Sequence, residues 1–135
     1  MKKVKAIIER GESGIYIITL AEDYGLSYAL LGDGETVEDA KNDFMQCYNE
    51  MKEYYNEAGK KFTELDITFE FEMAAFLAAF SGKLSLSGLQ NITGIHQKQL
   101  SHYLHGVRRP KGSTVQKVNT ALFNFRKDLE RVHLV

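Results

Sequence analysis

The sequence predicts an α+β fold, with an N-terminal part of the form β-β-β-α-β followed by an all-helical part. Residues 1–80 contain short apolar runs between glycine-containing turns, whereas residues 81–135 show helical spacings of three and four. The formal charge divides in the same place, −8 in the first segment and +7 in the second, although the whole chain carries only −1. We therefore expect two domains, residues 1–72 and 73–135, with different partners.

Composition restricts the classes of protein to which the chain can belong. Its 135 residues, 44% of them hydrophobic, can form one ordinary domain or two small domains with a packed core. No apolar run approaches the roughly 20 residues of a membrane span, and the run broken by Lys5 is too short for a signal peptide. The single cysteine, Cys47, forms no intramolecular disulfide, which fits a reducing compartment. We therefore expect a cytoplasmic protein that does not contact a membrane.

The N-terminal strands follow from short apolar runs and the turns between them. Residues 4–9 and 15–20 predict two strands, and the turn at residues 10–14 joins them as a hairpin. Residues 27–31 predict a third short strand, and the glycine-rich residues 32–34 predict a turn at its end.

A long helix and a fourth strand are expected next. Thr36 predicts the N-cap of the helix, and Gly59 predicts its end. Apolar residues at spacings of three and four mark the expected buried face: Val37, Ala40, Phe44, Cys47, Met51, Tyr54 and Ala58. Residues 66–72 alternate between polar and apolar types, which predicts a half-buried strand. Two interpretations stay open for four tyrosines, a contact surface or the edge of the core: Tyr28, Tyr48, Tyr54 and Tyr55.

The C-terminal part predicts four helices. The first three are expected at residues 73–80, 86–93 and 96–105. The last should begin at Ser113, which has capping-box spacing to Gln116. An apolar stripe on this helix should close the helical core, or in part form a dimer seam: Val115, Val118, Leu122, Phe125, Leu129 and Val132.

The second and third of these helices predict a helix-turn-helix that reads DNA. Gly94 supplies the tight turn, and four side chains are expected to point inward: Leu89, Ile95, Leu100 and Tyr103. The outer face of residues 96–105 then carries the expected base-reading residues Gln97, Lys98, Ser101 and His102. The expected phosphate contacts are Gln99, Arg108, Arg109 and Lys111.

Two positions of this motif depart from the usual pattern. Gln90 stands where a small alanine is common, and Thr93 stands where an apolar residue is common. We therefore expect looser packing around the turn. The alternative interpretation of the whole segment is a helical bundle with a solvated basic face.

The chain resembles a HicB-type antitoxin with a C-terminal helix-turn-helix. The resemblance rests on the order of elements through Val4–Leu20, Ser27–Gly32, the segment from Gly32 to Ala40 and the strand Ile67–Phe71, together with the repressor-like segment from Gly94 to Tyr103. It implies a partial ribonuclease-H-like N-terminal fold that neutralises a HicA-like RNA-cleaving toxin. It also implies repression of the shared operon through binding of double-stranded operator DNA, and a single reading helix makes a homodimer or higher homo-oligomer the expected state.

An enzyme and a stand-alone regulator are the two other classes of function to which the sequence is compared. A metal-dependent nuclease needs clustered carboxylates, whereas the strand-borne Glu9, Glu70 and Glu72 are expected on solvated faces, so we expect no enzyme. His96, His102 and His105 stand at spacings of six and three, without a fourth ligand or any cysteine beside them. We therefore expect no metal and no cofactor. A stand-alone transcriptional regulator, whose N-terminal domain binds a ligand or another protein, stays the alternative.

Overall fold

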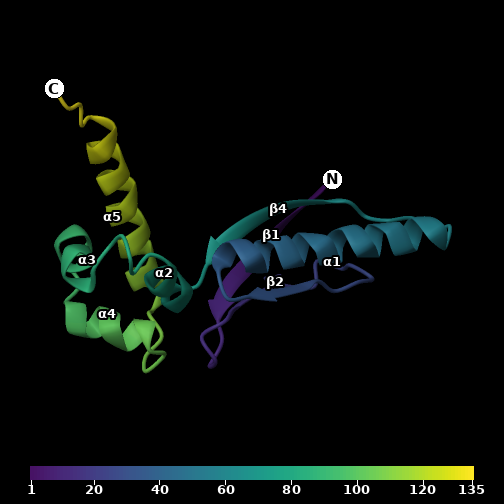
Figure 1. Cartoon of the computed structure of the whole chain (residues 1–135), viewed down its shortest axis with the longest axis horizontal. Coiled ribbons are helices and arrows are strands. Elements are labelled where there is room, and N and C mark those ends of the chain that lie inside the picture. The colour runs from purple at the N-terminus through teal and green to yellow at the C-terminus, as the bar shows by residue number, and fades with distance from the viewer. The chain divides into compact units, whose positions relative to one another are not determined.

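The computed structural model describes all 135 residues and shows an α+β chain with a four-stranded sheet and five helices (Figure 1). The chain divides into two compact units, Met1–Ala75 and Phe76–Val135. This division lies within the helix α2 (Met73–Ala79), whereas the expected boundary lies immediately before that helix. No helix combines the length and the apolar character needed to cross a membrane.

The first unit is built on a mixed sheet with the strand order β3-β2-β1-β4. Its strands are β1 (Lys2–Arg10), β2 (Tyr16–Leu20), β3 (Leu31–Gly34) and β4 (Leu65–Phe71). The predicted hairpin is confirmed, because β1 and β2 pair antiparallel from Ala6 opposite Leu20 to Arg10 opposite Tyr16. β4 pairs parallel to β1, which requires the chain to cross over through the helix between β3 and β4.

That crossover helix, α1 (Val37–Glu57), begins as predicted at Thr36, whose Oγ1 accepts a hydrogen bond of 3.1 Å from the Asp39 N–H. Its buried residues are Ala40, Phe44 and Tyr48, and the late members of the predicted face leave it, with Tyr54 59% exposed. The predicted apolar residues repeat every seven positions. On a straight α-helix, such a row of side chains shifts around the helix axis by about 20° with each repeat. The covered face of the helix therefore passes from the predicted positions to Tyr48 and Tyr55, whose rings both lie near Phe62.

The predicted third strand was misplaced. Residues 27–30 are irregular, and β3 instead contains the Gly-Asp-Gly sequence that predicted a turn. A Cβ atom on Gly32 would lie 2.5 Å from the Phe44 nitrogen, and one on Gly34 would lie 2.7 Å from the Ala40 nitrogen. These glycines thus serve the close approach of α1 to the sheet and do not form a reversal of the chain.

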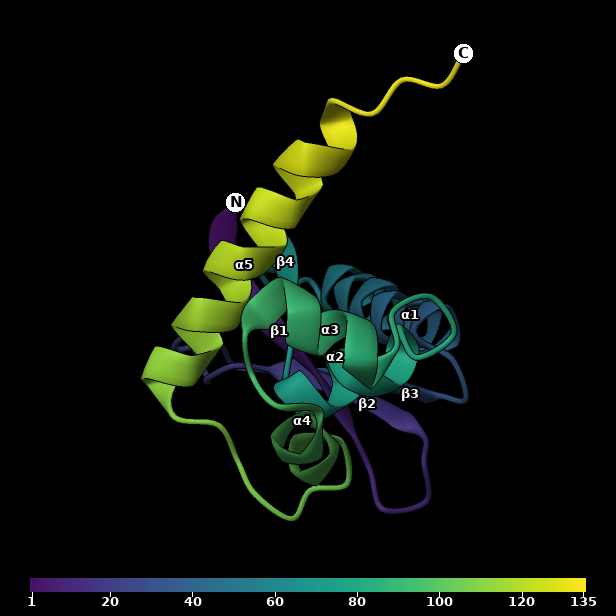
Figure 2. The same cartoon turned by 90° about the vertical axis from the view of Figure 1, so that its left-hand side faces the viewer.

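The second unit contains α3 (Leu86–Thr93), α4 (Gln97–Leu104) and α5 (Gly112–Glu130) (Figure 2). The predicted ranges of α2, α3 and α4 agree with these bounds to within one residue at each end. The predicted capping box of α5 is wrong, because Lys111 is the N-cap and makes no side-chain capping bond. The Lys111 carbonyl accepts hydrogen bonds of 3.0 Å from the N–H groups of Thr114 and Val115, so Ser113 lies inside the first turn.

The apolar stripe of α5 closes the core only in its middle. Val118 is buried and Leu122 and Phe125 are half-buried, whereas Leu129 is 55% and Val132 61% exposed. With 19 residues, α5 is more than twice as long as α3 and α4, which have eight each. Its last turns therefore extend beyond the helices that could cover them.

Candidate nucleic-acid interface

A small apolar core holds α3 and α4 together. The four side chains predicted to point inward are all buried: Leu89, Ile95, Leu100 and Tyr103. Gly94 ends α3 with φ 76°, the left-handed conformation that glycine adopts without a steric penalty. These residues fix the direction in which α4 leaves the turn, and with it the face that α4 presents to solvent.

The N-terminus of α4 is closed by side chains on both sides of the turn. The Gln90 Oε1 accepts a hydrogen bond of 2.8 Å from the Gln97 N–H. His96 is the N-cap, and its Nδ1 accepts a hydrogen bond of 3.0 Å from the Lys98 N–H. The His96 carbonyl accepts the N–H of Gln99 at 2.9 Å. The first N–H groups of the helix are therefore already bonded, and a ligand at this end must be held by side chains.

Thr93, the second departure from the usual motif, is buried and fully bonded. Its Oγ1 donates to the Leu89 carbonyl at 2.7 Å and accepts from the Ile95 N–H at 3.1 Å. Both departures from the usual motif, Gln90 and Thr93, thus use their polar side chains to bond backbone groups around the turn. Sequence reasoning also missed the role of His96, although its place at the start of a predicted helix was a signal.

The predicted base-reading residues lie along one exposed side of α4. Gln97 and Lys98 are exposed, and Ser101 and His102 are half-buried. The side chains of Gln97, Lys98 and His102 make no hydrogen bond or ion pair within the chain, whereas the Ser101 Oγ lies 3.3 Å from the His105 Nδ1. Three of the four residues therefore keep all their donors and acceptors for a partner.

The predicted phosphate contacts separate into two groups. Arg108, Arg109 and Lys111 are exposed in the loop after α4, and none of them forms an ion pair. Gln99 is half-buried, and its Nε2 donates a hydrogen bond of 2.5 Å to the Tyr103 hydroxyl. The structure thus places Gln99 in the bonding network of α4, apart from the three free cations.

A groove of about 730 Å³ lies between α3 and α5. Its lining is mainly of amide and hydroxyl side chains over the apolar Ile92, Ala121 and Phe125. Lys117, which sequence reasoning did not select, lines this groove and brings its Nζ near Gly94, 3.8 Å from where a Cβ atom would stand. The second unit therefore carries a further unpaired cation beside the turn that precedes α4.

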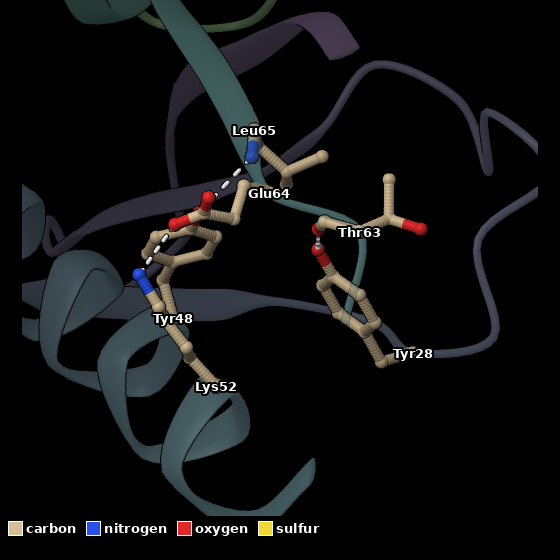
Figure 3. A network of polar contacts seen from close by, with 6 residues as sticks. All are labelled: Tyr28, Tyr48, Lys52, Thr63, Glu64 and Leu65. Atoms are coloured by element: carbon tan, nitrogen blue, oxygen red, sulfur yellow. Dashed lines mark hydrogen bonds and ion pairs between the residues drawn. The ribbon is translucent and has the colours of Figure 1, made fainter. Parts of the chain in front are cut away.

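Tyr28 and Tyr48 bond backbone groups at the edge of the core of the first unit (Figure 3). The Tyr28 hydroxyl donates a hydrogen bond of 2.6 Å to the Thr63 carbonyl, and the Tyr48 hydroxyl accepts one of 3.0 Å from the Leu65 N–H. Burial, together with Tyr48 and Tyr55, raises the pKa of Tyr28 to about 12. Tyr55 is half-buried, and Tyr54 is the exposed member of the four tyrosines considered in the sequence.

An ion pair lies beside this cluster, between Lys52 of α1 and Glu64 (Figure 3). The hydrogen bond between them raises the pKa of the Lys52 ammonium and lowers the pKa of the Glu64 carboxyl. Both groups are close to half exposed, so the pair contributes little to stability.

The carboxylates and histidines are not arranged as a metal centre. No group of three or more His, Cys, Asp and Glu side chains is placed to hold a metal ion. Of the acids predicted on strands, Glu70 pairs with Lys5 at 3.5 Å, Glu9 is exposed on β1, and Glu72 lies just past the end of β4. The His105 Nδ1 lies 2.9 Å from the Ser101 carbonyl, within hydrogen-bonding distance.

Comparisons with protein-family models, with curated proteins and with solved structures found no match. The chemistry available to the chain is therefore argued from its own residues. The second unit offers unpaired hydrogen-bonding side chains on a fixed helix beside unpaired cations, which is the combination that binds a polyanion while contacting uncharged polar groups.

Proposed function

We propose that the chain is a HicB-type antitoxin whose second unit binds operator DNA through α4 and whose first unit neutralises a HicA-like toxin. The observation that carries the proposal is the arrangement of bonded and unbonded groups on α4. Its N-terminus is closed by Gln90 and His96, its inner side is buried, and its outer side presents the unpaired Gln97, Lys98 and His102.

The dimensions and chemistry of α4 suit the major groove of B-DNA. An α-helix with its side chains is about 10–12 Å across, which fits the groove width of about 12 Å. A glutamine amide pairs with adenine and a lysine ammonium pairs with guanine, and Gln97 and Lys98 lie in the first turn, where helices of this kind reach base edges. Under this proposal, α3 and α4 form a helix-turn-helix.

Phosphate contacts fall to the loop between α4 and α5. Arg108, Arg109 and Lys111 are exposed and have no acidic partner, so their binding to DNA breaks no ion pair within the chain. The second unit has nine Lys and Arg against two acids. Such a surface attracts the DNA backbone independently of sequence and fixes the register of the reading helix.

The first unit supports the antitoxin part of the proposal through its charge and its order of elements. Its net charge is −8, which complements the basic surface that an RNA-cleaving toxin needs for its substrate. The hairpin, third strand, helix and parallel fourth strand follow the order that the family resemblance implies. A partial ribonuclease-H-like fold is accordingly part of the proposal.

A homodimer completes the proposal, because one short helix makes few base contacts. The exposed Leu129 and Val132 at the end of α5 offer apolar surface that a second copy could cover. Two copies related by a two-fold axis would present two α4 helices to half-sites one helical turn apart.

The test combines DNA binding with toxin neutralisation. We expect the full chain to shift duplex DNA from upstream of its own gene in a gel, and to rescue growth when it is co-expressed with the protein encoded beside it. DNA binding without rescue would favour the stand-alone regulator. Absence of any DNA binding at low salt would refute the role proposed for α4.

A further inference from the structure

We propose that Val107 contacts a thymine methyl group in the DNA that α4 reads, so that base reading continues past the C-terminal end of the helix. The inference rests on the proposed DNA binding and adds an apolar contact to a surface otherwise made of polar and charged groups. It is carried by the backbone geometry, the exposure and the charged neighbours of Val107.

The backbone holds Val107 against the last turn of α4. Gly106 takes φ 72°, and its N–H donates to the Tyr103 carbonyl at 3.2 Å. The Val107 N–H donates to the His102 carbonyl at 2.9 Å. These two bonds form a Schellman motif, so Val107 has a defined position one turn from the proposed base-reading residue His102.

The side chain of Val107 lacks the apolar partner that the helix end usually supplies in this motif. In a Schellman motif the residue at this position commonly packs against an apolar side chain three or four positions inside the helix end. Here those positions are His102 and Ser101, which are polar. Val107 is 70% exposed, more than any other large apolar side chain between Lys2 and His133. Its methyl groups are therefore free for an external partner.

The surroundings of Val107 indicate the chemistry of that partner. Arg108 and Arg109 follow it directly, Lys111 comes next, and none of these cations is paired. A partner that covers this tract must carry negative charge and also present an apolar group between the charges. The major groove of DNA does so, because the C5-methyl group of thymine lies between two phosphate backbones and is contacted by apolar side chains.

The experiment exchanges thymine for uracil, which removes only that methyl group. The wild-type full chain first selects duplexes from a random-sequence pool, and fluorescence anisotropy then measures binding when each thymine in turn is replaced. We expect one position per half-site at which uracil weakens wild-type binding about fourfold, the value for one buried methyl group. Val107→Ala should bind the thymine and uracil duplexes equally at that position.

Two controls separate this effect from altered folding or charge. Leu31→Ala removes an exposed apolar side chain of β3, in the first unit, and should keep the wild-type response to uracil. Val107→Thr keeps one methyl group and should keep part of the wild-type response to uracil. If Val107→Ala shows the wild-type response at every thymine, the contact is refuted while DNA binding stands. If the wild type selects no duplex, the proposed DNA binding fails and this inference fails with it.

Discussion

The Gln90 side-chain oxygen lies 2.8 Å from the Gln97 nitrogen and accepts its hydrogen bond, which ties the end of α3 to the first turn of α4. The two residues are seven positions apart and stand on opposite sides of the turn at Gly94. Because the bond fixes one helix against the other, the direction of α4 depends on a side chain that carries none of the proposed DNA contacts.

Gln90→Ala should therefore lower the stability of the second unit by about 0.5–1.5 kcal/mol, the contribution of one hydrogen bond. Gln90→Glu keeps an acceptor and adds a negative charge near a helix N-terminus, so it should recover the stability that Gln90→Ala loses. Urea unfolding of the full chain measures both changes. Equal stability of wild type and Gln90→Ala would show that the bond contributes nothing in solution.

His96→Ala should cost about 1 kcal/mol, because it removes the side-chain acceptor for the Lys98 N–H. His96→Asp supplies a preferred N-cap and should recover or exceed wild-type stability. The same unfolding series measures this pair. A loss of stability in His96→Asp equal to that of His96→Ala would argue against a capping role.

Lys98→Ala and His102→Ala should each relax sequence preference at one or two operator positions, at a cost of about 1–3 kcal/mol for the preferred base. Band shifts on a set of singly substituted operators measure the effect. Lys83→Ala is the matched control, because Lys83 is exposed but lies over the Phe80 ring, in the connection between α2 and α3. A uniform loss across all operators would contradict base reading.

The double variant Arg108→Ala, Arg109→Ala should weaken binding to every duplex and flatten its salt dependence. Each lost phosphate contact reduces the slope of log K against log salt by about 0.9, so the expected change is about 1.8. Gln99→Ala should leave the slope unchanged, because Gln99 bonds Tyr103. An unchanged slope in the double variant would remove this loop from the interface.

Alkaline pH should destabilise the first unit through Tyr28. Its pKa is raised from 10.0 to about 12 in the folded chain, so between these values the folded state keeps a proton that the unfolded state releases. The stabilisation is fully present below pH 10 and is lost as pH rises toward 12. Tyr28→Phe should show a smaller decline in the free energy of unfolding between pH 9 and 11, whereas Tyr54→Phe should decline like the wild type. Identical declines in all three proteins would contradict this assignment.

Local patterns in the sequence sufficed for most helices and for part of the sheet. The period of apolar residues, the N-cap Thr36 and the stops at Gly59 and Gly106 placed α1 to α4, because each signal acts within a few residues of itself. The same patterns identified the inward side chains of the second unit. They also placed Gln97 and Lys98 on the exposed side of α4.

The remaining features depend on atoms that are distant in the sequence. Gly32 entered a strand and not a turn because α1 packs against it. Gln90 became a cap because the turn brings Gln97 to it, and Leu129 stayed exposed because no neighbouring helix extends far enough to cover it. The sequence by itself determined where helices begin, which residues are apolar and how charge divides between the halves. Only the tertiary structure decided which polar side chains form hydrogen bonds within the chain and which remain free, since that depends on distances between elements.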